Sequence, residues 1–166
     1  WDELIPDRQS AMRRAAALFR LCSGAIPWRF LVLSADVLCA RLVSRERFMA
    51  NCLHIRVGDR LEREFFESYL DRCGYRSAPL VEEPGNCAVR GFVVDLFVPG
   101  MEWPVRIEFF GDEVESIRHF SSENQASLDA LDQVWIYPTR QTVPGATSEE
   151  QSAIRDRIRE VCDTVN

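Results

Sequence analysis

The chain has 166 residues, of which 46% are hydrophobic and 28% charged, the composition of a globular protein with one sizeable core or two small ones. All 20 basic residues are arginine, so the chain holds no P-loop lysine and no Schiff-base lysine, and we expect it not to be an enzyme. The net charge is −6, and residues 81–166 carry 16 acidic residues against 7 arginines, which makes a poor surface for duplex DNA.

The six cysteines are scattered and contain no Cys-x-x-Cys pair. We therefore expect reduced thiols, no bound metal and no cofactor in this chain. The sequence also contains no long apolar span and no charged-then-apolar leader, which predicts a soluble, cytoplasmic protein without a membrane partner.

The first 51 residues predict a piece of an α/β layer. Residues 8–21 have apolar side chains at helical spacing, and Gly24 with Pro27 closes that helix. Residues 29–33 form a short apolar run of strand length, Ser34 or Asp36 can cap a helix that continues to about Leu42, and Ser44 opens a further short helix.

Residues 53–57 alternate as a strand that ends at Gly58. Asp59 and Glu62 have the spacing of a capping box, which predicts a helix over 60–73 that stops at Gly74. The apolar stripe expected on that helix consists of Leu61, Phe65, Tyr69 and Leu70.

The rest of the chain predicts an antiparallel sheet, with the helix at 60–73 covering one face, and hence an α+β fold. Strands are expected at 77–82, 87–90, 92–98, 105–110, 113–120 and 134–137, with a hairpin tip at Gly111-Asp112 and a helical turn at 127–132. A terminal helix is expected from Ser148 onward.

In the strand at 105–110, Val105, Ile107 and Phe109 point one way, so Phe110 falls on the polar face beside Arg106. Phe110 could tuck under a loop at the sheet edge, or it could serve with Arg106 as an anchor for a partner protein.

Arg90 ends a strand just before Gly91, and it could pair with Asp95 or Glu108, or bind an acidic partner. The acidic cluster of Asp112, Glu113 and Glu115 is typical of a solvated hairpin tip, and we find no catalytic constellation.

Six motifs follow one another along the middle of the chain: GYR at 74–76, EPG at 83–85, VRG at 89–91, DLF at 95–97, PVRIEFFGDE at 104–113 and ESIR at 115–118. Together they resemble the UvrA-interacting domain shared by bacterial UvrB and the transcription-repair coupling factor Mfd. Mfd-like sequences fit better, because UvrB-like ones tend to have arginine where this chain has Ala88. The opening WDELIP and the QASL segment at 125–128 also resemble the Mfd pattern.

This resemblance implies an α+β UvrA-interaction domain over 52–138, preceded at 1–51 by the end of a degenerate helicase-like domain, to which 139–166 return. It implies a non-catalytic module that recruits UvrA in nucleotide excision repair. Motors that use ATP and magnesium, and regions that bind RNA polymerase and DNA, would lie outside this chain. The alternatives are a UvrB fragment, a helicase-like DNA-binding fragment, or a structural spacer.

The resemblance also implies the contact residues, which are Arg90, Arg106 and Phe110, with Asp112, Glu113 and Arg118 in support. The chain departs from the family pattern at Val98, Ser121 and Ala126, and at 138–141. None of these departures falls on the three expected contacts.

Overall fold

The computed structural model describes residues 7–24, 27, 29–39 and 41–141. The helix expected from Ser148 and the opening WDELIP motif lie outside the described residues. The helices are α1 (Arg8–Ser23), α2 (Ala35–Leu38), α3 (Arg45–Met49) and α4 (Arg63–Arg72). The strands are β1 (Leu53–Arg56), β2 (Arg76–Ser77), β3 (Asn86–Arg90), β4 (Val93–Leu96), β5 (Val105–Phe110), β6 (Glu113–Phe120), β7 (Ser127–Leu131) and β8 (Gln133–Ile136).

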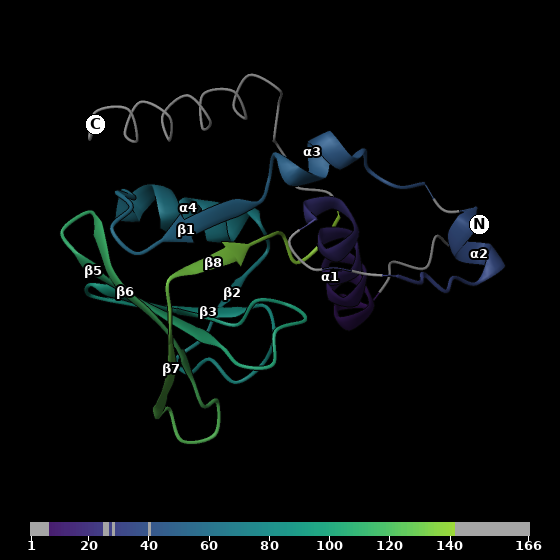
Figure 1. Cartoon of the computed structure of the whole chain (residues 1–166). Helices are drawn as coiled ribbons and strands as arrows, with labels where there is room; N and C mark the ends of the chain where they lie inside the picture. The colour runs from purple at the N-terminus through teal and green to yellow at the C-terminus, as the bar shows by residue number, and fades with distance from the viewer. Residues whose placement is uncertain (1–6, 25–26, 28, 40, 142–166) are drawn as a thin grey trace.

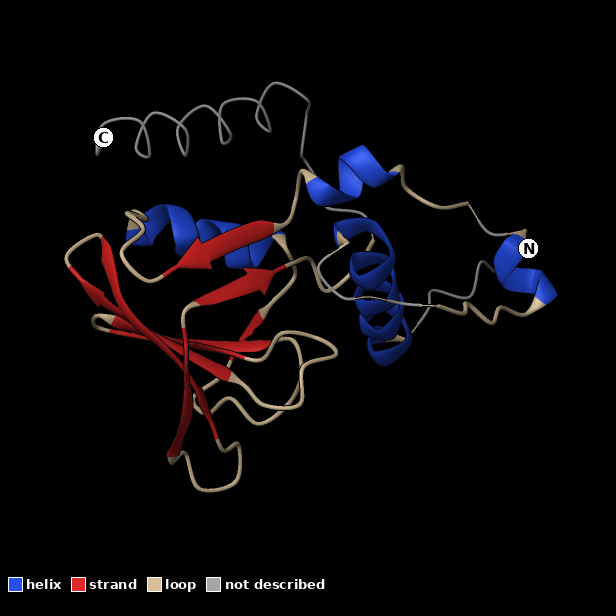
Figure 2. Ribbon diagram, in the orientation of Figure 1, coloured by secondary structure: helices blue, strands red, loops and turns tan. Residues whose placement is uncertain are grey.

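The fold is α+β, as the sequence predicts, with two sheets (Figures 1 and 2). One sheet is the antiparallel pair of β1 and β8, and the other has six strands in the order β2-β3-β4-β5-β6-β7. Every pairing in the larger sheet is antiparallel except that of β2 with β3, so this sheet is mixed rather than purely antiparallel.

The main core lies between α4, the β1–β8 pair and one face of the larger sheet. The cross-strand row Val94, Ile107 and Ile117 is buried on that face. Phe66 of α4 packs against Phe109 of β5 with ring centroids 6.1 Å apart. The predicted alternation of buried and outward-facing residues along β5 is therefore confirmed, and α4 covers this face as expected.

Helix α1 shares this core instead of standing apart from it. The ring of Phe19 stacks on that of Tyr137 at 4.4 Å. The helix begins at an Asp7 carboxylate that accepts a hydrogen bond from the Ser10 amide, and it ends at Gly24, whose φ of 69° is the left-handed conformation that glycine tolerates. None of these contacts tests the expected division into three segments, which stays a prediction.

The strand predicted at residues 29–33 is wrong. These residues belong to no helix and pair with no strand among the residues described, and Phe30 and Val32 are 90% and 93% exposed. An apolar run becomes a strand only when a neighbour takes its backbone hydrogen bonds, and the edges of both sheets lie elsewhere. The helix that follows Ser34 is also shorter than expected, since it spans only Ala35–Leu38, and the Ser34 side chain makes no capping hydrogen bond to it.

The helix predicted over 60–73 forms, but it begins three residues later. Asp59 accepts a hydrogen bond from the Arg56 amide instead of capping the helix. The backbone of Arg60 forms an isolated antiparallel β-bridge with that of Glu113. These contacts hold residues 58–61 against the start of β6, so the capping box is absent. The buried helical stripe is consequently Phe66, Tyr69 and Leu70 in place of Phe65.

Two other elements differ from prediction. The strand expected at 77–82 has only the two residues of β2, and the helical turn expected at 127–132 is instead strand β7. β7 pairs with β6 at the edge of the sheet, where hydrogen bonding to a neighbour outweighs the weak helical preference of an exposed segment. Within the described part of the chain, no helix has the length and apolarity needed to cross a membrane.

The buried ionisable groups of the core predict lower stability in alkali. Burial raises the pKa of Cys73 to about 12, well above the ordinary value of 9.0, and likewise raises the pKa of Tyr137 to about 12. The folded chain therefore holds these protons more tightly than the unfolded chain does, so stability is complete below about pH 9 and is lost as the pH rises toward 12.

We expect the free energy of unfolding in urea to be lower at pH 10 than at pH 8, with Cys73 and Tyr137 together contributing about 1 to 2 kcal/mol of the difference. A Cys73→Ala variant, although less stable overall, should lose less over the same interval. Equal stability at both pH values would contradict this expectation.

Candidate functional site

The outward face of the larger sheet carries charged residues in cross-strand register. Asp95 on β4 lies opposite Arg106 on β5, which in turn lies opposite Arg118 on β6. Arg90 on β3 lies opposite Val93 on β4, two residues from Asp95 and on the same face of the sheet. Since alternate residues of a strand share a face, Phe110 also lies on this side, four residues beyond Arg106.

The carboxylate of Asp95 is fully buried and holds two arginines at once. It accepts hydrogen bonds from Nε and Nη2 of Arg106, at 2.7 and 3.0 Å, and a further bond from Nη2 of Arg90. Two parallel bonds from one guanidinium fix its plane as well as its position. Asp95 thereby sets the orientation of both arginines.

Arg106 is further held by an aromatic ring. Its guanidinium lies 4.7 Å from the centre of the Phe120 ring, and Phe120 belongs to a small second core on this face with Val81, Ala88 and Phe97. The hydrogen bonds to Asp95 raise the pKa of Arg106 above its already high value, so this side chain stays charged. The Arg106 side chain remains one-fifth exposed and can contact a partner.

A second polar group lies beside the first. Arg118 donates to the carboxylate of Glu108 and, at 2.9 Å, to the hydroxyl of Ser116, which itself donates to Glu108. Three arginines and two carboxylates thus form this set of ion pairs, which carries one net positive charge.

Phe110 stands clear of the sheet. It is 78% exposed, so the alternative in which it tucks under a loop is wrong. It precedes the two-residue turn of Gly111 and Asp112, where Gly111 has a φ of 62°, and the equivalent turn after Arg90 begins at Gly91 with a φ of 58°. Both turns lie at the same end of the sheet because β3 and β5 run in the same direction.

The supporting residues separate into two groups. Arg118 lies within the charged face, whereas Asp112 and Glu113 are exposed at the β5–β6 turn, as the sequence predicts for a solvated tip. Within the described ranges, no group of three or more histidine, cysteine or acidic side chains is arranged to hold a metal ion.

From the sequence, Asp95 was expected only as a possible ion-pair partner of Arg90. Its position between Arg90 and Arg106, where it binds both, was not predicted. A carboxylate within the apolar run 92–98 was the available signal, because a buried charge must be paired. Phe92 was also missed. It is 61% exposed, and its carbonyl accepts a 2.8 Å hydrogen bond from the Phe109 amide at the same end of the sheet.

Residues 53–141, more than half of the chain, match the family described as the UvrB interaction domain. The chain belongs to the UvrB interaction domain family. The match begins at β1 and continues past β8, so it includes both sheets and the charged face.

The relatives of this chain include transcription-repair-coupling factors and UvrABC system proteins B. A transcription-repair-coupling factor of Myxococcus xanthus is 37% identical over all of this chain, and that of Haemophilus influenzae is 36% identical over 85% of it. A UvrABC system protein B of Thermosipho africanus is 35% identical over 64% of the chain. The chain spans only 14%, 12% and 16% of these three proteins, respectively.

Proposed function

We propose that this UvrB interaction domain is a non-catalytic docking module that recruits UvrA during nucleotide excision repair, as part of a transcription-repair-coupling factor. The observation that carries the proposal is the pair of arginines, Arg90 and Arg106, held by one buried carboxylate beside the exposed Phe110. The names of the relatives support a place in transcription-coupled repair.

The physical argument rests on preorganisation. Side chains that are already fixed lose little conformational freedom on binding, so more of the contact energy appears as affinity. Arginine and aromatic residues are also the types most enriched among the few interface positions that dominate binding. On this face, two fixed arginines offer donors to an acidic partner, and Phe110 offers an apolar anchor.

Binding of this kind needs neither nucleotide nor metal in the module itself. The arginines of the face are already neutralised in part by Asp95 and Glu108, which weakens them as phosphate ligands. The exposed ring of Phe110 beside them favours a protein partner that also offers apolar groups. We therefore propose that nucleic acid, RNA polymerase and ATP are bound by other regions of the longer proteins.

Titration of the purified chain with UvrA tests this function. We expect Phe110→Ala to weaken binding by about 2 kcal/mol, roughly thirtyfold, because it removes an anchor from the interface. Folding should be unaffected, since the ring is mostly exposed. The matched control is Phe30→Ala, which removes a ring that is 90% exposed on a different part of the chain. Equal affinities for wild type and Phe110→Ala would reject this anchor.

A further inference from the structure

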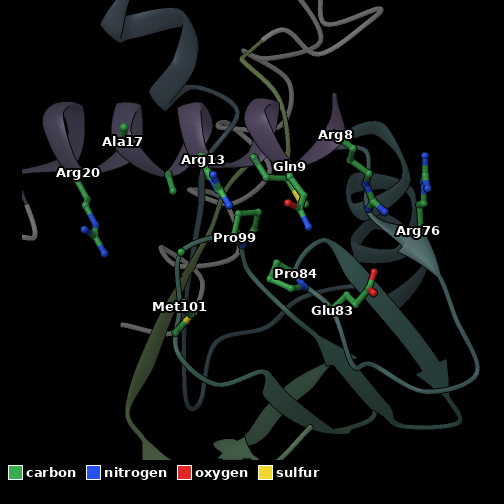
Figure 3. Close-up of a pocket in the computed structure, with 13 residues that line it drawn as sticks. Arg8, Gln9, Arg13, Ala17, Arg20, Arg76, Glu83, Pro84, Pro99 and Met101 are labelled. Atoms are coloured by element: carbon green, nitrogen blue, oxygen red, sulfur yellow. The ribbon is translucent and has the colours of Figure 1, made fainter. Parts of the chain in front are cut away.

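A cleft runs along the flank of α1 (Figure 3), and its described lining shares no residue with the charged face described above. Its volume is about 720 Å³. One wall is the helix from Arg8 to Arg20, and the other consists of β2 with the loops at 83–84 and 99–101.

Two glycines allow these loops to come close to the helix. A Cβ on Gly85 would lie 2.7 Å from the Met12 sulfur, and a Cβ on Gly100 would lie 2.8 Å from the Ala16 side chain. Both glycines also have a positive φ, of 82° and 80°, which other residues rarely adopt. The walls of the cleft are therefore fixed by close packing at both loops.

Among the described residues, four arginines line the cleft, namely Arg8, Arg13, Arg20 and Arg76, against a single carboxylate, that of Glu83. Figure 3 shows arginines of α1 projecting from the helix toward the opposite loops. In the part of the chain that the structure describes, none of the four forms a salt bridge, whereas the arginines of the sheet face are all paired.

Arg13, Arg20 and Arg76 are exposed to solvent, whereas Arg8 is partly buried at the cleft wall. Arg8 donates a 2.7 Å hydrogen bond to the Gly85 carbonyl, which holds its side chain at the cleft wall. Burial, and after it repulsion from the neighbouring Arg76, lower the pKa of Arg8, while Glu83 acts in the opposite direction. An anionic ligand would relieve that repulsion.

The shape of the cleft favours an extended chain. The thirteen residues from Arg8 to Arg20 cover about 18 Å of helix, the length of roughly five residues of extended peptide. Among the described residues, the lining contains no aromatic ring on which bases of a nucleic-acid strand could stack. Its apolar part comes instead from methionine, alanine and proline side chains, which suit a peptide.

We propose that this cleft binds an extended acidic peptide segment of a protein partner, through carboxylates that pair with Arg13, Arg20 and Arg76. The site is separate from the UvrA-docking face and does not depend on it. Arg106→Ala should therefore leave peptide binding unchanged.

Fluorescence anisotropy with the full chain and a labelled peptide of alternating glutamate and alanine tests this proposal. The double variant Arg13→Gln/Arg20→Gln should weaken binding about tenfold or more, because it removes two charge-assisted contacts. The matched control is Arg41→Gln/Arg47→Gln, which removes two exposed arginines outside the cleft and should leave the affinity unchanged. Glu83→Gln should strengthen binding severalfold, since it removes the only opposing carboxylate.

A peptide with glutamine in place of glutamate should not bind. The proposal is overturned if the glutamate peptide fails to bind the wild-type chain, or if both double variants weaken it equally. It is also overturned if a single-stranded oligonucleotide of similar length binds more tightly than the peptide and loses that affinity in Arg13→Gln/Arg20→Gln.

Discussion

Asp95→Asn is expected to lower the free energy of unfolding by about 3 kcal/mol, because it leaves Arg90 and Arg106 without the buried charge that both of them face. The substitution keeps the shape of the side chain, so the loss reports charge and hydrogen bonding instead of packing. The measurement is urea unfolding followed by circular dichroism, in which the midpoint should fall while the slope stays constant.

Glu108→Gln is the matched control for this effect. Glu108 also pairs with one arginine on the same face, but both partners are about one-third exposed, so its loss should cost less than about 1 kcal/mol. If Asp95→Asn were no more destabilising than Glu108→Gln, Asp95 could not be the residue that organises the face.

Arg106→Ala is expected to weaken UvrA binding by about 3 kcal/mol, on the order of a hundredfold, which exceeds the effect of removing Phe110. Two losses combine in this variant. The partner loses a fixed guanidinium, and Arg90 loses the neighbour with which it shares Asp95. The measurement is the same titration with purified UvrA, at a temperature where the variant is folded.

Arg106→Lys separates charge from geometry. Lysine keeps the positive charge but cannot form two parallel bonds to Asp95 or lie flat over Phe120, so we expect an affinity between those of wild type and Arg106→Ala. Arg47→Ala, which removes an exposed arginine on α3, serves as the control and should bind as wild type does. An Arg106→Lys variant with wild-type affinity would show that charge alone is sufficient.

The hairpins of the site could be predicted from the sequence because their signals are local. In β5 the apolar residues alternate with polar ones, and Gly111 marks the turn, which together fix the side to which Arg106 and Phe110 point. The two-residue turn at Gly91 likewise places Arg90 opposite Val93.

The features that could not be predicted from the sequence depend on contacts between segments that are far apart in the chain. The bidentate bond from Arg106 to Asp95 requires the register of β4 against β5, and the loop between them is too long to fix it. The run at 29–33 has the composition of a strand, but no described strand pairs with it, while residues 127–131 form a strand because β6 offers an edge. The cleft along α1 likewise depends on loops that are far from the helix in sequence.

Hydrogen–deuterium exchange of the chain, alone and with UvrA, tests the central claim most directly, namely that the face bearing Arg90, Arg106 and Phe110 is the docking surface. The amides of the turns at 91–92 and 111–112, which lie at the exposed end of that face, should exchange more slowly in the complex. Those of α1 and of the β1–β8 pair should not change. Protection confined to α1 or to β1 and β8, with none at the two turns, would contradict the account.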